Sequence, residues 1–299
     1  MSNSTEIKLI CPSNWKDYEL IDCGNFQKLE RFGQVVLCRP EPQAIWDSTM
    51  PEKEWQKRYH AKFETDTKVH NGEKGKWTFN KKTPETWLIN YESGGLKFKM
   101  VLGFNTFKHI GIFPEQADNW DYIYKNLVNN SNPEKKVLNL FAYTGAASLA
   151  SAAAGAETLH VDSVKQVINR ASENARHSNI EGIKWIVEDA LKFVQREQRR
   201  GKLYNGIILD PPAFGHGPNG EKWILEKNLN EILKNCAAIL QPKDSFLILN
   251  LYSLGFSSII SENLIKQNFP DVNYEFGENY LPDSFGKKLP LGTFIRFAR

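Results

Sequence analysis

The stretch KVLNLFAYTGAASLASAAAGAETLHVD, residues 136–162, decides the fold. An apolar run (136–143) passes through one glycine, Gly145, into a helix of small residues, and ETLHVD (157–162) follows as a second apolar run. A strand, a helix and a second strand at this spacing are typical of a crossover between parallel strands. The stretch therefore predicts a parallel sheet with helices packed on it.

The same alternation continues to the end of the chain. Further helices are expected over residues 163–179, 190–200, 221–240 and 257–267, and further strands over residues 183–189, 204–210, 245–253, 272–277 and 292–299. With the two runs in 136–162 this makes seven strands, and the connections place helices on both faces of the sheet. The fold class expected is α/β, with a Rossmann-like seven-stranded sheet.

Residues before about 105 follow a different pattern. Short runs rich in β-branched and aromatic residues alternate with glycine and asparagine turns, and PEKEWQKRYHAKF (51–63) has the charge pattern of a short helix. We therefore expect a small β-rich N-terminal domain over residues 1–105, barrel-like or sandwich-like with one helix. A second domain over residues 106–299 would hold the seven-stranded sheet.

The first of these domains carries a local excess of positive charge. Residues 51–108 hold 12 lysines and arginines against 7 aspartates and glutamates, with aromatic residues among them. The aromatic residues include Trp55, Tyr59, Phe63, Trp77, Phe79, Trp87, Tyr91 and Phe98. Cations that meet phosphates and rings that stack on bases would suit an RNA-binding surface. The alternative is that the rings form a core and the lysines only keep the domain soluble.

Composition excludes several classes of protein. Apolar residues make up 41% of the 299 residues and charged residues 24%, values typical of a globular chain. The four cysteines, Cys11, Cys23, Cys38 and Cys236, form no CxxC pair and indicate neither a disulfide framework nor a zinc site. The N-terminus lacks a leader pattern and no apolar run is long enough for a membrane span. We expect a cytoplasmic protein with no metal and no membrane partner.

Acidic residues follow three consecutive strands of the predicted sheet. They are Asp162, Asp189 and Asp210. In open parallel sheets, ligands bind outside the carboxyl ends of the strands. Carboxylates at the ends of buried strands require hydrogen-bond donors, so three in succession indicate a ligand site. For Asp162 or Asp189 taken singly, the alternative is that the acid only caps the following helix.

The loop after the first strand distinguishes two ligand classes. A dinucleotide site requires three glycines so that pyrophosphate can approach a helix N-terminus, and here the turn holds only Gly145. A single glycine suits a nucleoside without a pyrophosphate. Asp162 is placed to accept hydrogen bonds from ribose hydroxyls, and Asp189 from an exocyclic amine such as that of adenine. A cationic nucleoside with these groups is S-adenosylmethionine.

The fourth strand ends in GIILDPPAFGHGP, residues 206–218. Asp210 follows a fully apolar run, and the next two residues are prolines, which cannot donate ladder hydrogen bonds. An aromatic residue, Phe214, comes two residues later. We expect a rigid shelf on which a flat target lies against the ring of Phe214 while Asp210 faces the polar edge of the target.

Together these motifs resemble class I S-adenosylmethionine-dependent methyltransferases, and in particular the bacterial large-subunit ribosomal RNA methyltransferases that act on cytosine carbon 5 or guanine nitrogen 7. The resemblance lies in LNLFAYTGAASLASAAAGA, HVDSVKQVINRASENARHSNI, VEDALKFV and LDPPAFGHGP. HIGIFPEQADNW (109–120) is similar to the segment that precedes the family's first strand. The resemblance implies S-adenosyl-L-methionine as cofactor and RNA, ribosomal RNA above all, as substrate.

The resemblance also implies roles for individual residues. The residues expected to contact the cofactor are Gln116, Asn139, Phe141, Tyr143, Thr144, Gly145, Asp162, Ser163, Asp189, Ala190 and Asp210. Asp162 would hold the ribose, with Ser163 beside it. Asp189 and the amide of Ala190 would read the adenine edge. The catalytic residues, which border the methyl group and the target base, would be Asp210, Pro211, Pro212 and Phe214.

One departure from the family concerns the acceptor atom. Members that methylate cytosine carbon 5 carry a cysteine after the fifth strand, because that carbon reacts only after a thiolate adds to carbon 6. The segment 249–253 has no cysteine, and Asn250 fits the nitrogen-methylating members better. Cys236 falls in the preceding helix, where a structural role is expected. RNA methylation on nitrogen is therefore favoured. The alternatives are a cytosine-carbon-5 enzyme, a protein or small-molecule methyltransferase, and a non-catalytic RNA-binding assembly factor.

Overall fold

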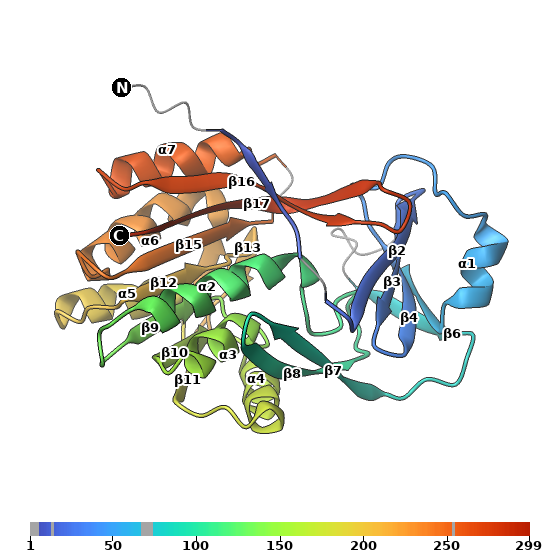
Figure 1. Ribbon diagram of the computed structural model, residues 1–299, viewed down its shortest axis with the longest axis horizontal. Coiled ribbons are helices and arrows are strands. Elements are labelled where there is room, and N and C mark those ends of the chain that lie inside the picture. The colour runs from blue at the N-terminus through green and yellow to red at the C-terminus, as the bar shows by residue number, and fades with distance from the viewer. Residues whose placement is uncertain (1–5, 13–14, 67–73, 253–254) are drawn as a thin grey trace. The chain divides into compact units, whose positions relative to one another are not determined.

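The computed structural model describes residues 6–12, 15–66, 74–252 and 255–299 (Figure 1). The chain forms two compact units. Unit 1 comprises Met1–Ile10, Asp118–Asn279 and Leu291–Arg299, and unit 2 comprises Cys11–Ala117 and Tyr280–Pro290. The units therefore alternate along the chain, whereas the sequence pattern suggested a single division at residue 105.

Unit 1 is built on an eight-stranded sheet with the order β1-β16-β17-β15-β12-β9-β10-β11. The strands are β1 (Lys8–Ile10), β9 (Lys136–Leu140), β10 (Glu157–Asp162), β11 (Ile183–Val187), β12 (Gly206–Leu209), β15 (Phe246–Leu251), β16 (Tyr274–Pro282) and β17 (Lys288–Ala298). Strand β17 is antiparallel to β15, and the pairs from β15 through β11 are parallel. The seven predicted strands are confirmed. The eighth, β1, pairs in parallel with β16 and was not predicted, because three residues carry no periodic pattern.

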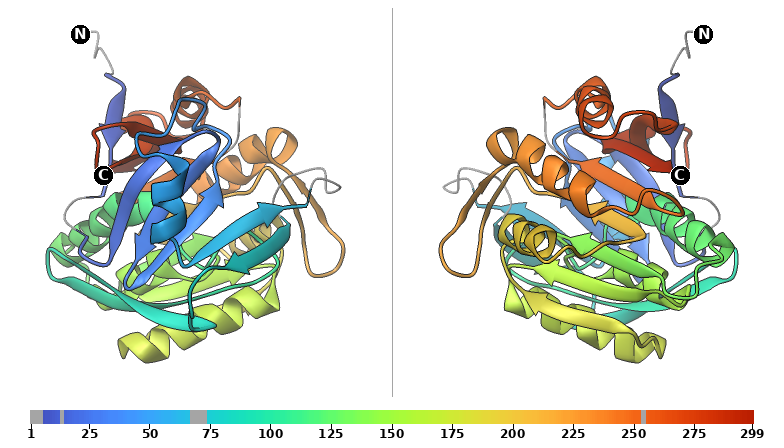
Figure 2. Two further views of the ribbon diagram at one scale, coloured as in Figure 1. Left: turned by 90° about the vertical axis from the view of Figure 1, so that its right-hand side faces the viewer. Right: turned by 90° about the vertical axis from the view of Figure 1, so that its left-hand side faces the viewer.

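Helices cover both faces of this sheet (Figures 1 and 2). They are α2 (Ala117–Asn129), α3 (Ala146–Ala153), α4 (Lys165–Ser178), α5 (Ala190–Arg199), α6 (Leu225–Ile239) and α7 (Ser258–Asn268). Leu138, Leu209 and Leu249 pack in one apolar core with residues of α5, α6 and α7. Alternate strand residues point to the other face, where Asn139 contacts α3 and Asn250 contacts α2. None of the described helices is long and apolar enough to cross a bilayer.

Two predicted helices differ from the structure. The helix expected over residues 221–240 begins only at Leu225, because residues 214–224 form a hairpin of β13 (Phe214–His216) and β14 (Lys222–Ile224). The indole of Trp223 is buried and donates to the carbonyl of Pro212 at 2.7 Å, which holds this hairpin against the double proline. The helix expected over 51–63 is shorter, since α1 (Glu52–Arg58) gives way to β5.

Unit 2 is β-rich, as expected for the N-terminal part of the chain. It contains a five-stranded sheet in the order β2-β3-β4-β5-β6 and the ribbon of β7 and β8. The strands are β2 (Tyr18–Gly24), β3 (Gln27–Phe32), β4 (Val35–Pro40), β5 (Ala61–Thr65), β6 (Gly75–Phe79), β7 (Thr86–Ser93) and β8 (Leu96–Gly103), and the 3-10 helix η1 covers Pro114–Gln116. Residues 67–73, part of the predicted basic segment, lie outside the described ranges.

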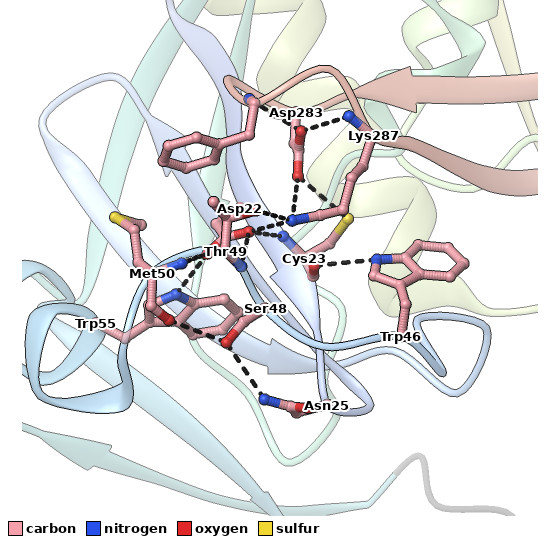
Figure 3. A network of polar contacts seen from close by, with 11 residues as sticks. Asp22, Cys23, Asn25, Trp46, Ser48, Thr49, Met50, Trp55, Asp283 and Lys287 are labelled. Carbon is pink, nitrogen blue, oxygen red and sulfur yellow. Dashed lines mark hydrogen bonds and ion pairs between the residues drawn. The ribbon is translucent and has the colours of Figure 1, made fainter.

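A buried carboxylate joins the distant segments of unit 2. Asp22 on β2 is inaccessible to solvent and accepts hydrogen bonds from the backbone N–H of Met50 at 2.8 Å and the indole of Trp55 at 3.0 Å (Figure 3). The ammonium of Lys287 forms ion pairs with Asp22 at 2.8 Å and with Asp283 at 3.1 Å. Burial alone would raise the pKa of Asp22. The hydrogen bonds from these donors, of which Lys287 has the largest effect, lower it by a larger amount, so that the pKa lies below its usual value. The turn between β16 and β17 is thereby fixed to β2.

Candidate cofactor and target site

The carboxyl ends of neighbouring strands form one edge of the unit 1 sheet. Leu209 of β12 pairs with both β9 and β15, and the residues one step beyond this row are Phe141, Asp210 and Asn250. Strand β10 continues the row on the other side of β9 and ends at Asp162. The register therefore brings together side chains that are far apart in sequence, as expected for ligand sites in parallel sheets.

The loop between β9 and α3 has a backbone that few sequences can adopt. Phe141, Tyr143 and Gly145 have φ values of 55°, 49° and 91°. A Cβ atom at Gly145 would lie 3.1 Å from the Cβ of Ala171 and 3.4 Å from the ring of His160. Both the positive φ and the lack of space require glycine here. The loop thus turns tightly at the ends of the strands.

Buried polar side chains support this loop from below. Asn139 is 2% exposed and donates to the hydroxyl of Ser148 at 2.9 Å, and that hydroxyl lies 3.0 Å from Nδ1 of His160. Burial lowers the pKa of His160 to about 3, so the imidazole is neutral. The carbonyl of Thr144 accepts from the Asn174 amide at 2.9 Å. Asn139 therefore fixes the loop, and its direct contact with a cofactor stays a prediction.

Asp162 closes the same loop. Its two carboxylate oxygens accept hydrogen bonds from the backbone N–H groups of Tyr143 and Val164, each at 2.9 Å. Burial raises the pKa of Asp162, while these donors, and the backbone N–H of Ser163, act in the opposite direction. A carboxylate can accept about four hydrogen bonds, so both oxygens keep capacity for a ligand hydroxyl.

Asp189 is the N-cap of α5. Its Oδ1 accepts from the backbone N–H of Lys192 at 2.9 Å, and Ala190 is the buried first residue of the helix. The alternative that an acid in this position only caps its helix thus has direct support, and the adenine contact stays a prediction. Lys192 also forms an ion pair with Glu221 at 2.5 Å, which ties α5 to the hairpin after the double proline.

Asp210 differs from the other two acids because it has no partner. Within the described part of the chain its carboxylate makes no hydrogen bond or ion pair, although it is partly buried. Burial raises the pKa of Asp210 to about 7. Aspartate side chains at such positions are held ready for a proton or a hydrogen-bond donor that the protein itself does not supply.

The residues after Asp210 are those expected to form a shelf for the target, and that role stays a prediction. Pro211 is buried, whereas the ring of Phe214 is 65% exposed. Trp223 anchors this segment, since its indole donates to the carbonyl of Pro212 and its ring centroid lies 4.7 Å from that of Phe141. Trp223 was missed in the sequence because it was assigned to a helix. The glycines at 217 and 220, which form the hairpin turn, were the signal against that assignment.

Gln116, the remaining residue expected at the cofactor, ends the 3-10 helix η1 and belongs to unit 2. Its place at the cofactor stays a prediction.

Cys236 and Cys38 are poor candidates for a nucleophile. Cys236 is fully buried in the core between the sheet and α6, and burial raises the pKa of its thiol. Cys38 is buried in unit 2, and burial raises its pKa to about 12. Thiols with raised pKa values are poor nucleophiles because the thiolate is the reactive form. Cys236 is therefore structural, as expected.

The comparisons with known proteins agree with this geometry. The sequence model of a family described as S-adenosylmethionine-dependent methyltransferases matches residues 63–272. The crystal structure of an S-adenosylmethionine-dependent methyltransferase from Agrobacterium tumefaciens is 36% identical, has a TM-score of 0.89, and covers 100% of this chain and 97% of that chain. The α/β fold expected from the sequence is confirmed.

Two curated relatives are ribosomal RNA methyltransferases. The large subunit methyltransferase K/L of Pseudoalteromonas atlantica is 27% identical over 186 residues, which are 61% of this chain and 25% of the relative. The large subunit methyltransferase I of Pseudoalteromonas translucida is 23% identical over 174 residues, 57% of this chain and 41% of the relative. The chain therefore matches less than half the length of these relatives.

The residues at the sheet edge fit the cofactor that the family uses. Gly145 lets the loop after β9 turn tightly against His160 and Ala171, and Asp162 ends the second strand with spare acceptor capacity. Neither feature suits a pyrophosphate, which would require further glycines and N–H donors. On the family match and on this geometry, the chain belongs to the S-adenosylmethionine-dependent methyltransferase family.

Proposed function

We propose that this protein methylates RNA in the cytoplasm, and that large-subunit ribosomal RNA is its substrate. The observation that carries the proposal is the unpartnered carboxylate of Asp210, which is followed four residues later by the exposed ring of Phe214. A flat base can stack on the ring while its polar edge meets the acid. The names of the curated relatives favour ribosomal RNA over a protein or a small molecule.

The residues of the chain have separate tasks in this reaction. Asp162 would hold the ribose of S-adenosylmethionine, and Gly145 would let the loop approach its methionine part. When bound, the cofactor supplies an electrophilic methyl group. Phe214 and the double proline would hold the base in line with that group, since alignment alone can contribute several kcal/mol. Where the acceptor nitrogen carries a proton, the Asp210 carboxylate would accept it as the new bond forms.

We propose a nitrogen acceptor, because the segment 249–253 after the fifth strand holds no cysteine. The described residues of segment 249–253 are Leu249, Asn250, Leu251 and Tyr252, and Ser253 lies outside the described ranges. Within them, Asn250 is in the row of Asp210. A cytosine-carbon-5 enzyme requires a thiolate at the base, whereas a nitrogen lone pair attacks the methyl group directly.

The protein should form no covalent adduct with RNA that contains 5-fluorocytosine. Methylation of carbon 5 leaves an enzyme-linked intermediate that fluorine traps, because it cannot be eliminated, and nitrogen methylation has no such intermediate. Denaturing electrophoresis after incubation with cofactor and fluorinated RNA checks this. A stable adduct that disappears when one cysteine, such as Cys38, is replaced by serine would contradict the nitrogen assignment and restore the carbon-5 alternative.

Only part of the predicted basic segment 51–108 of unit 2 provides exposed aromatic residues for RNA binding. Of its aromatic residues, Trp55, Tyr59, Phe63, Tyr91 and Phe98 are buried, as the core alternative expected. Four others form a partly exposed group that we call the aromatic strip, Trp77, Phe79, Phe104 and Phe107. The ring of Phe104 lies 4.9 Å from that of Trp77 and 5.0 Å from that of Phe79, and Phe79 is 54% exposed.

Exposed lysines accompany the strip. Lys74 lies over the ring of Phe107 at 5.7 Å, and Lys76, Lys81 and Lys82 are exposed on or just after β6. Rings that can stack on bases, together with cations that can meet phosphates, are the two components of single-stranded RNA surfaces. We therefore propose that the strip holds part of the RNA.

Replacing both Lys74 and Lys82 with glutamine should weaken RNA binding and flatten its dependence on salt. Each lost phosphate contact lowers the slope of log K against log salt by about 0.7 for a single strand. Phe79→Ala should weaken binding by about 1–3 kcal/mol with the slope unchanged. Fluorescence anisotropy at several salt concentrations measures both effects. Lys97→Gln, at an exposed lysine on β8, is the matched control. An unchanged slope in the double variant would make the strip structural only.

The whole proposal is tested by mapping modified nucleosides in RNA from a strain that lacks the gene. One modification in large-subunit ribosomal RNA should disappear and return when purified protein and S-adenosylmethionine are added to that RNA. If protein extracts or small metabolites accept methyl groups and RNA does not, the substrate assignment is wrong while the family assignment stands.

A further inference from the structure

Asn250 is held by a chain of hydrogen bonds that the sequence did not indicate. The amide nitrogen of Asn119 on α2 donates to Oδ1 of Asn250 at 2.9 Å, and Nη1 of Arg296 on β17 donates to Oδ1 of Asn119 at 2.9 Å. All three side chains are more than nine-tenths buried. Arg296 is itself fixed by Glu275 at 2.5 Å and by Asp118 at 2.7 Å.

The orientation of both amides in this hydrogen-bond network follows from Arg296. An arginine can only donate hydrogen bonds, so the oxygen of the Asn119 amide must face Arg296. The nitrogen of Asn119 then faces Asn250, and Asn250 must offer its oxygen in return. The amide nitrogen of Asn250 then takes no part in the hydrogen bonds with Asn119 and Arg296. Arg296 thereby determines, through Asn119, which end of the Asn250 amide is presented.

The free end of Asn250 belongs to the candidate site. Asn250 occupies the row of Asp210 on the adjacent strand, on the same face of the sheet. No partner for its Nδ2 is found among the described residues, although the side chain is only 4% exposed. Nδ2 is not one of the fully buried polar atoms that lack a partner in the described part of the chain, so a ligand that accepts a hydrogen bond can reach it.

We propose that Asn250 donates a hydrogen bond to an acceptor atom of the target base, and that Asn119 and Arg296 are positioning residues that keep the amide in this orientation. The inference rests on the proposed RNA methylation and adds a specificity element to it. With Asp210 as an acceptor and Asn250 as a donor, the site recognises an edge on which an N–H group and a carbonyl oxygen or ring nitrogen lie side by side.

The test is the substitution Asn119→Asp. An aspartate offers acceptors to both neighbours, so Asn250 must turn its nitrogen toward residue 119 and present its oxygen to the site. We expect kcat/KM for RNA from the deletion strain to fall by about 10- to 100-fold, the effect of losing one buried hydrogen bond. Asn250→Asp, which also presents an oxygen, should fall equally.

Asn119→Ala separates the proposal from a merely structural role. Without Asn119 the Asn250 amide is unlocked but can still turn its nitrogen to the base, so a loss of only a few-fold is expected. If Asn119 only fills space and binds Arg296, the isosteric aspartate should be tolerated better than alanine. A milder effect for Asn119→Asp than for Asn119→Ala would therefore overturn the proposal.

Two measurements make the outcome independent of folding and of the proposed function. The affinity for S-adenosylhomocysteine and the melting temperature should be unchanged in Asn119→Asp, with Asn126→Asp on the same helix as the matched control. If wild-type protein methylates no RNA, the proposed function fails. If wild type is active and Asn119→Asp is equally active, the positioning role alone is wrong.

Discussion

Replacing Asp210 with asparagine should lower kcat at pH 8 by about two orders of magnitude or more and at the same time stabilise the fold. The amide keeps the shape of the side chain but cannot accept a proton, and proton transfer of this kind contributes about 10²–10⁴-fold. Activity assays on RNA and calorimetric melting of the same samples measure the two effects. Asp271→Asn, at an exposed aspartate in unit 1, is the matched control.

The pH dependence has an unusual sign. Because burial raises the pKa of Asp210 to about 7 from 3.8, the folded state binds more protons than the unfolded state between these values. Stability from this group is therefore present at low pH and lost as pH rises toward 7. The gain from asparagine should be about 1–2 kcal/mol at pH 8, after allowance for partial exposure, and should vanish near pH 4. Wild-type activity should rise toward a plateau above about pH 7. An Asp210→Asn variant that is less stable at pH 8 than wild type would contradict the raised pKa.

Replacing Asp162 with alanine should weaken the binding of S-adenosylmethionine and S-adenosylhomocysteine by about 100-fold or more. The ligand would lose charge-assisted hydrogen bonds worth about 1.5–3 kcal/mol each. The loop would also lose the acceptor for the N–H of Tyr143, whose φ of 49° is unfavourable without support. Calorimetric titration with S-adenosylhomocysteine measures the affinity. Asp162→Asn keeps one acceptor oxygen and should give an intermediate value. Unchanged affinity in a folded Asp162→Ala protein would show that the ribose lies elsewhere.

The sheet could be predicted because its information is local. Each of the seven predicted strands carries an apolar run of its own, and the helices between them carry their own periodicity. The hairpin of β13 and β14 was mistaken for helix because Trp223 and Ile224 extend the apolar pattern of α6. Their burial depends on the contact with Pro212, which no local pattern reveals.

The site was predictable only in its outline. Asp162 and Asp210 follow apolar strands in the sequence, and Gly145 can be recognised because it lies between the first strand and the following helix. The hydrogen-bond partners that determine the orientation and the pKa of such residues cannot be recognised in the sequence. Asp189 reads the same as a cap and as a ligand, and Asn119 lies 131 residues from Asn250. Among the aromatic residues before residue 105, Tyr91 and Phe98 lie on strands in which buried and exposed residues alternate, whereas the burial of Trp55 depends on its contact with Asp22, which no local pattern reveals.

The ion pair between Lys287 and Asp22 affects when unit 2 can fold during synthesis. Residues of unit 2 leave the ribosome at both ends of synthesis, and domains generally fold as they emerge. Asp22 is translated early, whereas its cation arrives only when the chain is nearly complete. Until Lys287 is synthesised, the carboxylate of Asp22 must either stay hydrated or be buried without its cation, which is unfavourable. Ribosome-bound chains that end before residue 280 should therefore remain sensitive to protease in β2, because they lack the turn between β16 and β17 that supplies Lys287.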